Sequence, residues 1–196
     1  MLHMINKILI ILSILSCSNF AQAKDILNKC IPAKAYMNNY EPANFNTTNN
    51  LLRKSGTDPL YCGEKILLDL EVVDKNCIPI SDAKIYLWQV GCDKKYPYAQ
   101  LRPAADKKMF NKAGGSTFLG SGIATTNNAG DTKFLTIFPP SIGNEAPNVN
   151  IRVEHKDFKP FQTKIFLKNY EMIDGDDYQT IQVRIVTPWE NLFRRY

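Results

Sequence analysis

Apolar residues occur at every second position in several stretches of this chain, and this alternation constrains the fold more than any other feature. The clearest stretches are Ile66, Leu68, Leu70 and Val72, then Tyr86, Trp88 and Val90, and finally Ile181, Val183 and Ile185. Successive side chains of a strand point to opposite faces, so a period of two is typical of strands with a buried face. The pattern predicts an all-β protein.

Turn-forming residues separate the predicted strands at intervals typical of a β-sandwich, notably at 81–82, 127–130 and 174–177. A chain of 196 residues with 44% hydrophobic content can bury one sizeable core. We therefore expect a single β-sandwich domain over residues 61–196, preceded by an irregular, Asn-rich N-terminal arm over residues 24–60. Residues 98–116 lack alternation and are expected to form a long loop.

The first 23 residues have the three parts of an export signal. Lys7 supplies the positive charge, residues 8–15 form a short apolar core, and Ala21-Gln22-Ala23 is a cleavage site. The apolar run is shorter than the roughly twenty residues of a membrane span, so we expect no membrane span. We expect a secreted or periplasmic protein. The alternative is a lipid anchor on Cys17, because residues 14–17 resemble a lipoprotein box, although Leu15 fits its position poorly.

Four cysteines remain after removal of the signal, and an even number in an oxidising compartment suggests two disulfides. If residues 66–74 and 83–90 form an antiparallel hairpin, Cys92 lies close to Cys62. Cys77 would then lie at the far end of a strand that rises about 3.3 Å per residue. A disulfide needs Cα atoms within about 7 Å. We therefore predict the pairs Cys62–Cys92 and Cys30–Cys77. Metal binding is the weaker alternative because the chain has no C-x-x-C pair.

Short motifs between residues 62 and 167 occur in the order found in one enzyme family. They comprise Val73-Asp74, Pro79-Ile80 and Ala83 to Trp88, then Phe118-Leu119-Gly120, Thr126 and Gly130, then Phe134, Thr136-Ile137-Phe138-Pro139 and Pro147 to Val153, and finally Thr163 to Phe166. Together they resemble the intradiol ring-cleaving dioxygenases. The resemblance implies the β-sandwich fold of that family. The N-terminal arm matches the family poorly.

The resemblance also implies where a metal site would lie. Active relatives hold ferric iron with two Tyr and two His, and the corresponding positions here are Tyr96, Ile142, Asn148 and Asn150. Only Tyr96 is a retained ligand position. Asn148 and Asn150 lie two residues apart on a predicted strand, so they project to the same side, where two His ligands would have to lie. His155 is an odd number of residues from Asn150 and is expected on the opposite face.

We therefore expect a degenerate metal site and a protein that acts by binding, with no resident cofactor, because carboxamides are poor ligands for ferric iron. The expected pocket includes Tyr96 and the three degenerate positions, with Tyr98 and Arg152 nearby. Its partner would be a small aromatic or polar ligand, or a protein that docks on the aromatic C-terminal segment 188–196. The alternative is an active Fe(III)-dependent dioxygenase that cleaves catechol-type rings with O2. The net charge of +5 is spread among acidic residues, so we expect no nucleic-acid partner.

Overall fold

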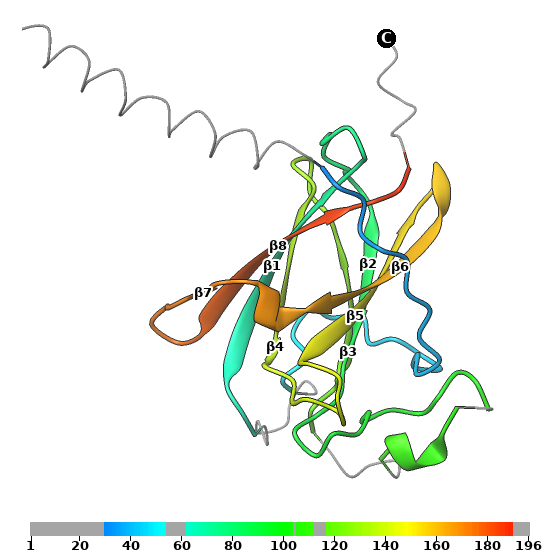
Figure 1. Ribbon diagram of the computed structural model, residues 1–196, viewed down its shortest axis with the longest axis vertical. Helices are drawn as coiled ribbons and strands as arrows, with labels where there is room; N and C mark the ends of the chain where they lie inside the picture. The colour runs from blue at the N-terminus through cyan, green and yellow to red at the C-terminus, as the bar shows by residue number, and fades with distance from the viewer. Residues whose placement is uncertain (1–29, 54–61, 104, 112–116, 190–196) are drawn as a thin grey trace, which may run out of the picture. The chain divides into compact units, whose positions relative to one another are not determined.

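The computed structural model describes residues 30–53, 62–103, 105–111 and 117–189 (Figure 1). The chain divides into two compact units, residues 1–31 and 32–196. Only Cys30 and Ile31 of the first unit are described, so every strand and the candidate site belong to the second. The predicted export signal, Cys17 and most of the aromatic C-terminal segment lie outside the described residues.

Two four-stranded sheets make up the second unit, as the alternation predicted. The first sheet has the order β4-β1-β8-β7 and comprises β1 (Lys65–Val73), β4 (Asp131–Ile137), β7 (Met172–Ile173) and β8 (Gln179–Val186). The second has the order β3-β2-β5-β6 and comprises β2 (Lys84–Trp88), β3 (Ser121–Thr125), β5 (Asn148–His155) and β6 (Phe158–Phe166). Neighbouring strands are antiparallel except β1 and β8, which are parallel. Two short 3-10 helices, η1 (Lys107–Met109) and η2 (Leu167–Asn169), lie in the connections.

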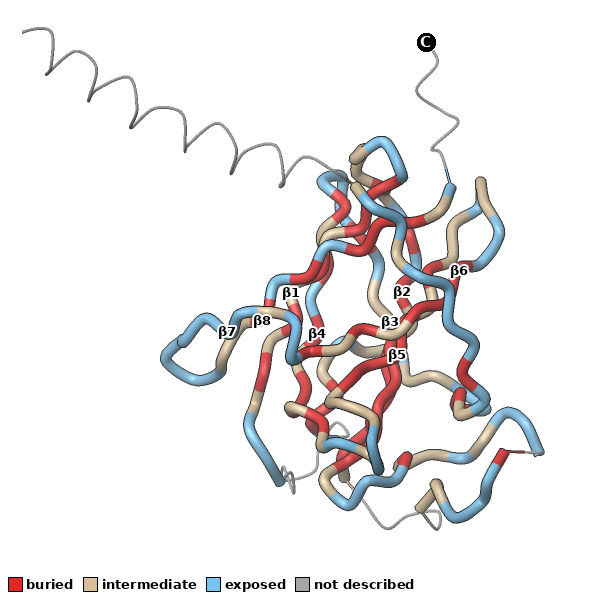
Figure 2. The backbone as a smooth tube through the Cα atoms, in the orientation of Figure 1, coloured by how far each residue is buried: buried red, intermediate tan, exposed pale blue. Residues whose placement is uncertain are grey.

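The core lies between the sheets and is made by the alternating apolar residues of β1, β5 and β8, together with Ile85 and Leu87 of β2. The other alternating row, Tyr86, Trp88 and Val90, lies outside this core, in a separate cluster with Tyr96. The inward side chains are all buried, namely Ile66, Leu68, Leu70 and Val72 of β1, Ile85 and Leu87 of β2, Val149, Ile151 and Val153 of β5, and Ile181, Val183 and Ile185 of β8. Figure 2 shows the buried residues along the facing strands. Burial of this apolar surface is the main force that holds the sheets together. The predicted all-β sandwich is therefore confirmed.

The predicted hairpin between residues 66–74 and 83–90 is wrong, because β1 and β2 lie in different sheets. The carboxylate of Asp74 accepts hydrogen bonds from the backbone amides of Asn76 and Ile78. This turn folds the chain back along the end of β1, where the amide of Ile80 donates to Val72 O. The chain then crosses to the second sheet. Alternation fixes which face of a strand is buried, but it does not fix the neighbouring strand.

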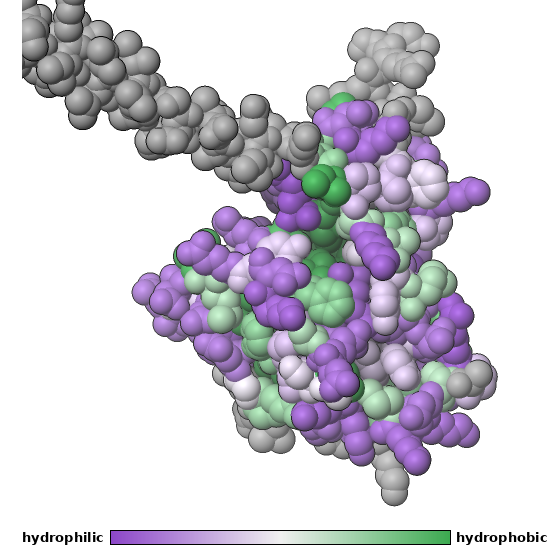
Figure 3. Space-filling model, viewed as in Figure 1, coloured by the Kyte–Doolittle hydropathy of each residue, from purple (hydrophilic) through white to green (hydrophobic). Residues whose placement is uncertain are grey.

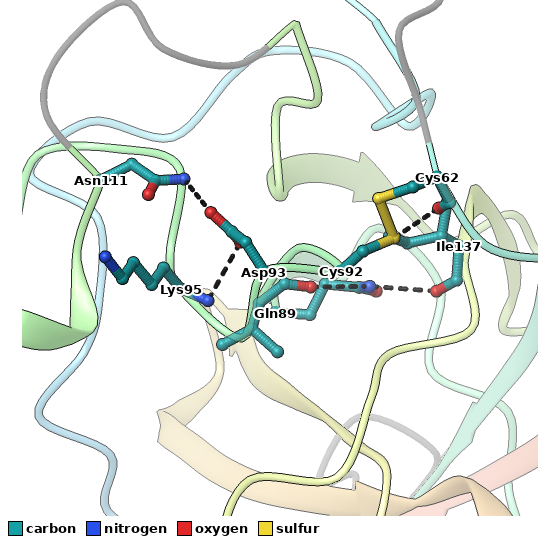
Figure 4. Close-up of a disulfide and its surroundings, with 8 residues drawn as sticks. Cys62, Gln89, Cys92, Asp93, Lys95, Asn111 and Ile137 are labelled. Atoms are coloured by element: carbon teal, nitrogen blue, oxygen red, sulfur yellow. Dashed lines mark hydrogen bonds between the residues drawn. A yellow bond between two sulfur atoms is a disulfide. The ribbon is translucent and has the colours of Figure 1, made fainter.

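The structure contains the disulfide between Cys62 and Cys92, whose Cα atoms are 6.0 Å apart (Figure 4). Cys62 precedes β1 and Cys92 follows β2, so the bond joins one sheet to the other. The buried side chain of Gln89 makes a second connection, since its Nε2 donates to Ile137 O at 3.0 Å. Cys30 and Cys77 are also disulfide-bonded, and their pairing with each other stays a prediction.

The predicted irregular arm is described from Cys30 to Arg53, and residues 32–53 belong to the same compact unit as the strands. It forms only isolated bridges, one between Pro42 and Gln100 and one between Asn50 and Leu135. Its backbone nevertheless bonds to both sheets, because the amide of Ala33 donates to Val186 O and the amide of Tyr36 donates to Gln162 O. The arm thus lies against the sandwich as irregular but ordered chain.

Polar side chains cover most of the face shown in Figure 3, and apolar side chains gather there in smaller groups. The exposed large apolar residues include Met37 in the arm and Met172 and Ile173 in β7. Within the described part of the chain, no helix has the length and apolarity needed to cross a membrane.

Candidate ligand-binding site

Asn148 and Asn150 lie on the face of β5 that points away from the sandwich core. Asn150 is only 1% exposed, and each half of its amide has a partner. Its Oδ1 accepts from Asn38 Nδ2 at 2.6 Å, and its Nδ2 donates to Trp88 O at 3.2 Å. Asn148 Nδ2 donates to Ala146 O at 2.7 Å. These amides therefore act as hydrogen-bonding groups that hold the surrounding chain.

Tyr96 lies beside Asn150 in a group of aromatic side chains that we call the tyrosine cluster, made of Tyr40, Tyr96, Tyr98 and Phe110. The Tyr96 ring stacks on that of Tyr40, with centroids 5.2 Å apart and planes 20° apart. Burial raises the pKa of Tyr96 to about 12, although hydrogen bonds from Asn38 and Asn150 to its hydroxyl oppose the shift. The phenol is therefore protonated at neutral pH, and its hydroxyl belongs to the same network as the two amides.

The N-terminal arm supplies the rest of this network. Asn38 is 5% exposed, and its Oδ1 accepts from the backbone amide of Tyr40 at 2.6 Å. Because its Nδ2 binds Asn150, this side chain connects the arm to β5 and helps to place Tyr40 over Tyr96. A buried amide with both ends paired is stabilising, whereas an unpaired one is costly.

The loop that carries Tyr96 is closed at its base. The amide of Tyr96 donates to Met109 O, and the amide of Asn111 donates to Tyr96 O. The Asp93 carboxylate also accepts from Asn111 Nδ2 at 2.8 Å (Figure 4). The loop therefore places Tyr96 and Met109 side by side, although η1 is the only helix among its described residues.

Arg152 and Tyr98 hold the arm and do not line the pocket described below. Arg152 pairs with the buried carboxylate of Glu41 and lies 2.9 Å from Glu154 Oε1. Its guanidinium lies 4.2 Å from the centre of the Tyr86 ring, a favourable cation–π geometry. Tyr98 donates its hydroxyl to Tyr40 O at 3.1 Å, and burial raises the pKa of Tyr98 well above its ordinary value.

A pocket of about 280 Å³ lies beside the tyrosine cluster. Its lining comes from the arm, from the 90–111 loop, from the connection between β4 and β5, and from β6. The lining residues are Tyr36, Met37, Asn38, Asn39, Tyr40, Tyr96, Met109, Ile142, Glu145 and Lys164. Two of the expected residues, Tyr96 and Ile142, are therefore in the wall. Asn148, Asn150, Tyr98 and Arg152 are not among the lining residues.

Lys164 is the cation of this pocket. It lies on β6 directly opposite Asn150 of β5. Its ammonium pairs with the carboxylate of Glu145 and lies 4.0 Å from the centre of the Tyr36 ring. Glu145 is on a tight turn, in which Ile142 and Glu145 exchange backbone hydrogen bonds. The turn that carries Ile142 thus also brings a carboxylate to the pocket.

The donor set does not fit ferric iron. Ile142 has no donor atom, and Asn148 and Asn150 offer only neutral amides whose Nδ2 groups are already hydrogen-bonded, so Tyr96 is the one family ligand position that could supply an anionic oxygen. Across the described ranges, no group of three or more His, Cys, Asp or Glu residues is placed to hold a metal ion. His155 lies at the other end of β5, stacked on Phe158 with ring centroids 5.0 Å apart.

A larger hollow of about 640 Å³ lies at that other end, lined by Asp82, Lys84, Glu154, His155, Lys156 and Pro160. Most of these residues are exposed, and the hollow has no aromatic wall apart from His155. The smaller pocket is the better candidate site because it combines apolar walls with a few buried polar groups, as ligand sites do.

Sequence reasoning missed Asn38, Tyr40, Met109, Glu145 and Lys164. Lys164 could have been identified from the sequence. The alternation of Phe161, Thr163 and Ile165 places Lys164 on the opposite face of its strand, which is the face of Asn150 once β5 and β6 are paired. The arm residues carry no periodic signal. Their position depends on contacts between segments more than 100 residues apart in the chain, such as Asn38 with Asn150, at a separation of 112.

Comparison with known proteins gives close relatives by sequence and wider similarity by structure, although no family model matches the chain. A Rickettsia felis protein named "Putative dioxygenase" is 41% identical over 166 residues, which cover 85% of this chain and 79% of that protein. A protein of the same name from Rickettsia bellii is 43% identical over 167 residues, again 85% of this chain and 79% of that protein.

Solved structures with the same fold include an intradiol ring-cleavage dioxygenase from Tetranychus urticae, with a TM-score of 0.63 and 18% identity over 82% of this chain and 97% of that one. The dioxygenase domain of a dioxygenase and carbohydrate-binding fusion from Streptomyces sp. SirexAA-E has a TM-score of 0.61 and 13% identity, over 82% of this chain and 100% of that one. At such low identity, the structural similarity establishes the fold alone.

Proposed function

The chain belongs to the same family as the Rickettsia proteins named "Putative dioxygenase" and has the intradiol dioxygenase fold, and from this premise we propose that it is an exported binding protein that does not cleave aromatic rings. It keeps the sandwich scaffold of the family and uses the pocket beside the tyrosine cluster to hold a small aromatic or polar molecule. Function resides in sites, which a scaffold can lose while its fold persists.

One observation carries the proposal, namely the hydrogen-bonded state of the residues at the family's metal positions. Asn150 uses Oδ1 and Nδ2 on Asn38 and Trp88, and Asn148 uses its Nδ2 on the neighbouring backbone. To bind a metal through Asn150 Oδ1, the chain would have to break a buried bond to the arm. Ferric iron prefers anionic oxygen and imidazole, so a neutral amide would not compensate for that loss.

The pocket supports the proposal that the protein binds a small molecule. Its walls are largely aromatic and apolar, and its polar groups are few and come from four separate segments of the chain. Such a site can orient a small planar molecule by ring contacts and a small number of hydrogen bonds. Three groups can make these hydrogen bonds to a ligand, namely the protonated Tyr96 hydroxyl, the Asn39 amide and the Lys164 ammonium.

The test is incubation of the purified protein with ferric salt, followed by metal analysis, visible absorption and oxygen uptake with catechol. We expect less than stoichiometric iron, no tyrosinate-to-iron absorption band and no oxygen uptake. An iron-containing intradiol dioxygenase treated in parallel is the positive control. Stoichiometric iron together with catechol-dependent oxygen uptake would overturn the proposal and establish the active enzyme as the correct reading.

A further inference from the structure

Lys164 is unusual because its cationic side chain is only 4% exposed in the wall of a pocket. Removing an ammonium from water is costly unless it is paired. Here the pairing comes from Glu145, and the Tyr36 ring covers the ammonium on another side. The pocket therefore contains a desolvated positive charge whose compensation depends on one carboxylate.

The two partners of this ion pair differ in exposure, and the difference determines which charge a ligand can carry. The Glu145 side chain is 36% exposed, on a turn at the surface. If a ligand carboxylate takes the place of Glu145 beside Lys164, the Glu145 side chain can return to water at little cost. A ligand cation that took the place of Lys164 would leave the buried ammonium without its partner. The site is thus suited to an anion and unsuited to a cation.

The side chains next to Lys164 determine the size and apolar character of the rest of the ligand. Tyr36 and Tyr40 of the arm, Tyr96 of the loop and the aliphatic side chain of Ile142 all line the same space. Flat apolar groups pack well against such rings. The volume of about 280 Å³ is at the small end of the range for ligand pockets, which limits the occupant to a small molecule.

We propose that this pocket binds small aromatic carboxylates, with Lys164 pairing with the carboxylate in place of Glu145 and the ring lying among Tyr36, Tyr40 and Ile142. The proposal rests on the binding function proposed above and adds the charge and the group that recognises it. It requires no pair of adjacent hydroxyl groups on the ring. Recognition of the carboxylate is a charge-assisted hydrogen bond, which is stronger than a neutral one.

Calorimetric titration with benzoate and with its neutral isostere benzamide tests the proposal in three variants. We expect the wild type to bind benzoate more tightly than benzamide. Lys164→Met should weaken benzoate binding by at least about tenfold and leave benzamide unchanged. Glu145→Gln should strengthen benzoate binding, because it removes the competing carboxylate. Lys168→Met is the matched control, since Lys168 is exposed and lies four residues further along the chain.

The opposite effects expected of Lys164→Met and Glu145→Gln distinguish recognition from a structural role. If the ion pair served only to hold the turn, both substitutions would weaken benzoate binding. Equal binding of benzoate and benzamide in all variants would overturn the anion site but leave the proposed binding function standing. If neither benzoate nor benzamide bound to the wild type or to any variant, the proposed function would fail and the anion site with it.

Discussion

Asn38 is a single polar residue whose loss we expect to affect both the arm and the pocket. Asn38→Ala removes the bond from its Nδ2 to Asn150 Oδ1 and leaves the Asn150 oxygen buried without that donor. A buried group that loses its partner costs about 1–3 kcal/mol. We therefore predict a decrease of about that size in the free energy of unfolding, measured by urea denaturation.

Asn39→Ala is the matched control, because Asn39 is the same residue type next along the chain and is exposed. We expect its stability to stay within about 0.5 kcal/mol of the wild type. Equal stabilities of Asn38→Ala and Asn39→Ala would mean that the amide network contributes nothing to folding.

The raised pKa of Tyr96 leads to a prediction at alkaline pH. Its pKa is about 12 in the folded protein and about 10 in an unfolded chain, so the folded state binds the phenol proton more tightly. The protonated Tyr96 phenol therefore stabilises the folded state. This contribution to the free energy of unfolding is fully present below pH 10 and is lost as the pH rises from about 10 to about 12. A difference of this size corresponds to about 3 kcal/mol, to an order of magnitude.

Tyr96→Phe is expected to reduce the stability loss over that pH range, measured as the free energy of unfolding at pH 9, 10 and 11. Tyr98 is also buried and has a raised pKa, so part of the loss should remain in the variant. The same pH dependence in the variant and the wild type would show that the Tyr96 hydroxyl is not perturbed in the folded protein.

At the scale of the strands and loops, the chain's alternation was sufficient to locate β1, β5 and β8 and to assign their buried faces. It also placed Asn148 and Asn150 on one side of β5, where the structure has them. It was not sufficient to identify the partners of β1, which are β4 and β8 and not β2, because the path from β1 to β2 depends on a local turn around Asp74. The crossing between sheets is therefore set by side-chain hydrogen bonds that hydrophobic periodicity does not contain.

The Cys62–Cys92 bond is expected to hold the loop of the candidate site as well as the sheets. It closes a chain segment with a sequence separation of 30 residues, and Cys92 lies four residues before Tyr96. A cross-link of this length stabilises a fold by about 3.5 kcal/mol in the chain-entropy model. We predict that Cys62→Ser/Cys92→Ser lowers the free energy of unfolding by about this amount.

Hydrogen exchange at the amides of Tyr96 and Asn111 then reports on the loop itself. Both amides close the base of the loop, and we expect them to exchange faster in the double variant than the amides of β5, after correction for the overall loss of stability. Uniform acceleration across all strands and the loop would mean that the disulfide acts only on global stability.

Across the whole molecule, family motifs predicted the fold better than they predicted the site. Motifs report on residues that a scaffold requires, such as the glycine at 130, where a side chain would lie 2.5 Å from Val72 O. The pocket instead depends on the arm, which matches the family poorly, and on the ion pair between Lys164 and Glu145. The arm has no local sequence signature, because its position depends on contacts between distant segments, and the ion pair can be located only after β5 and β6 are paired.

The cysteines and the N-terminal segment both predict that the chain is exported, which is a property of the whole molecule. Disulfides persist in oxidising compartments, and the described part of the chain contains four disulfide-bonded cysteines. We predict that the full chain, produced in a bacterium, is recovered from the periplasm or the medium with Lys24 as its first residue and no free thiol. N-terminal sequencing and thiol labelling measure the two outcomes. Ala21→Leu should slow processing by spoiling the cleavage site, whereas Gln22→Leu, the neighbouring control, should not. A mature protein that begins at Cys17 and partitions into detergent would instead establish a lipid anchor.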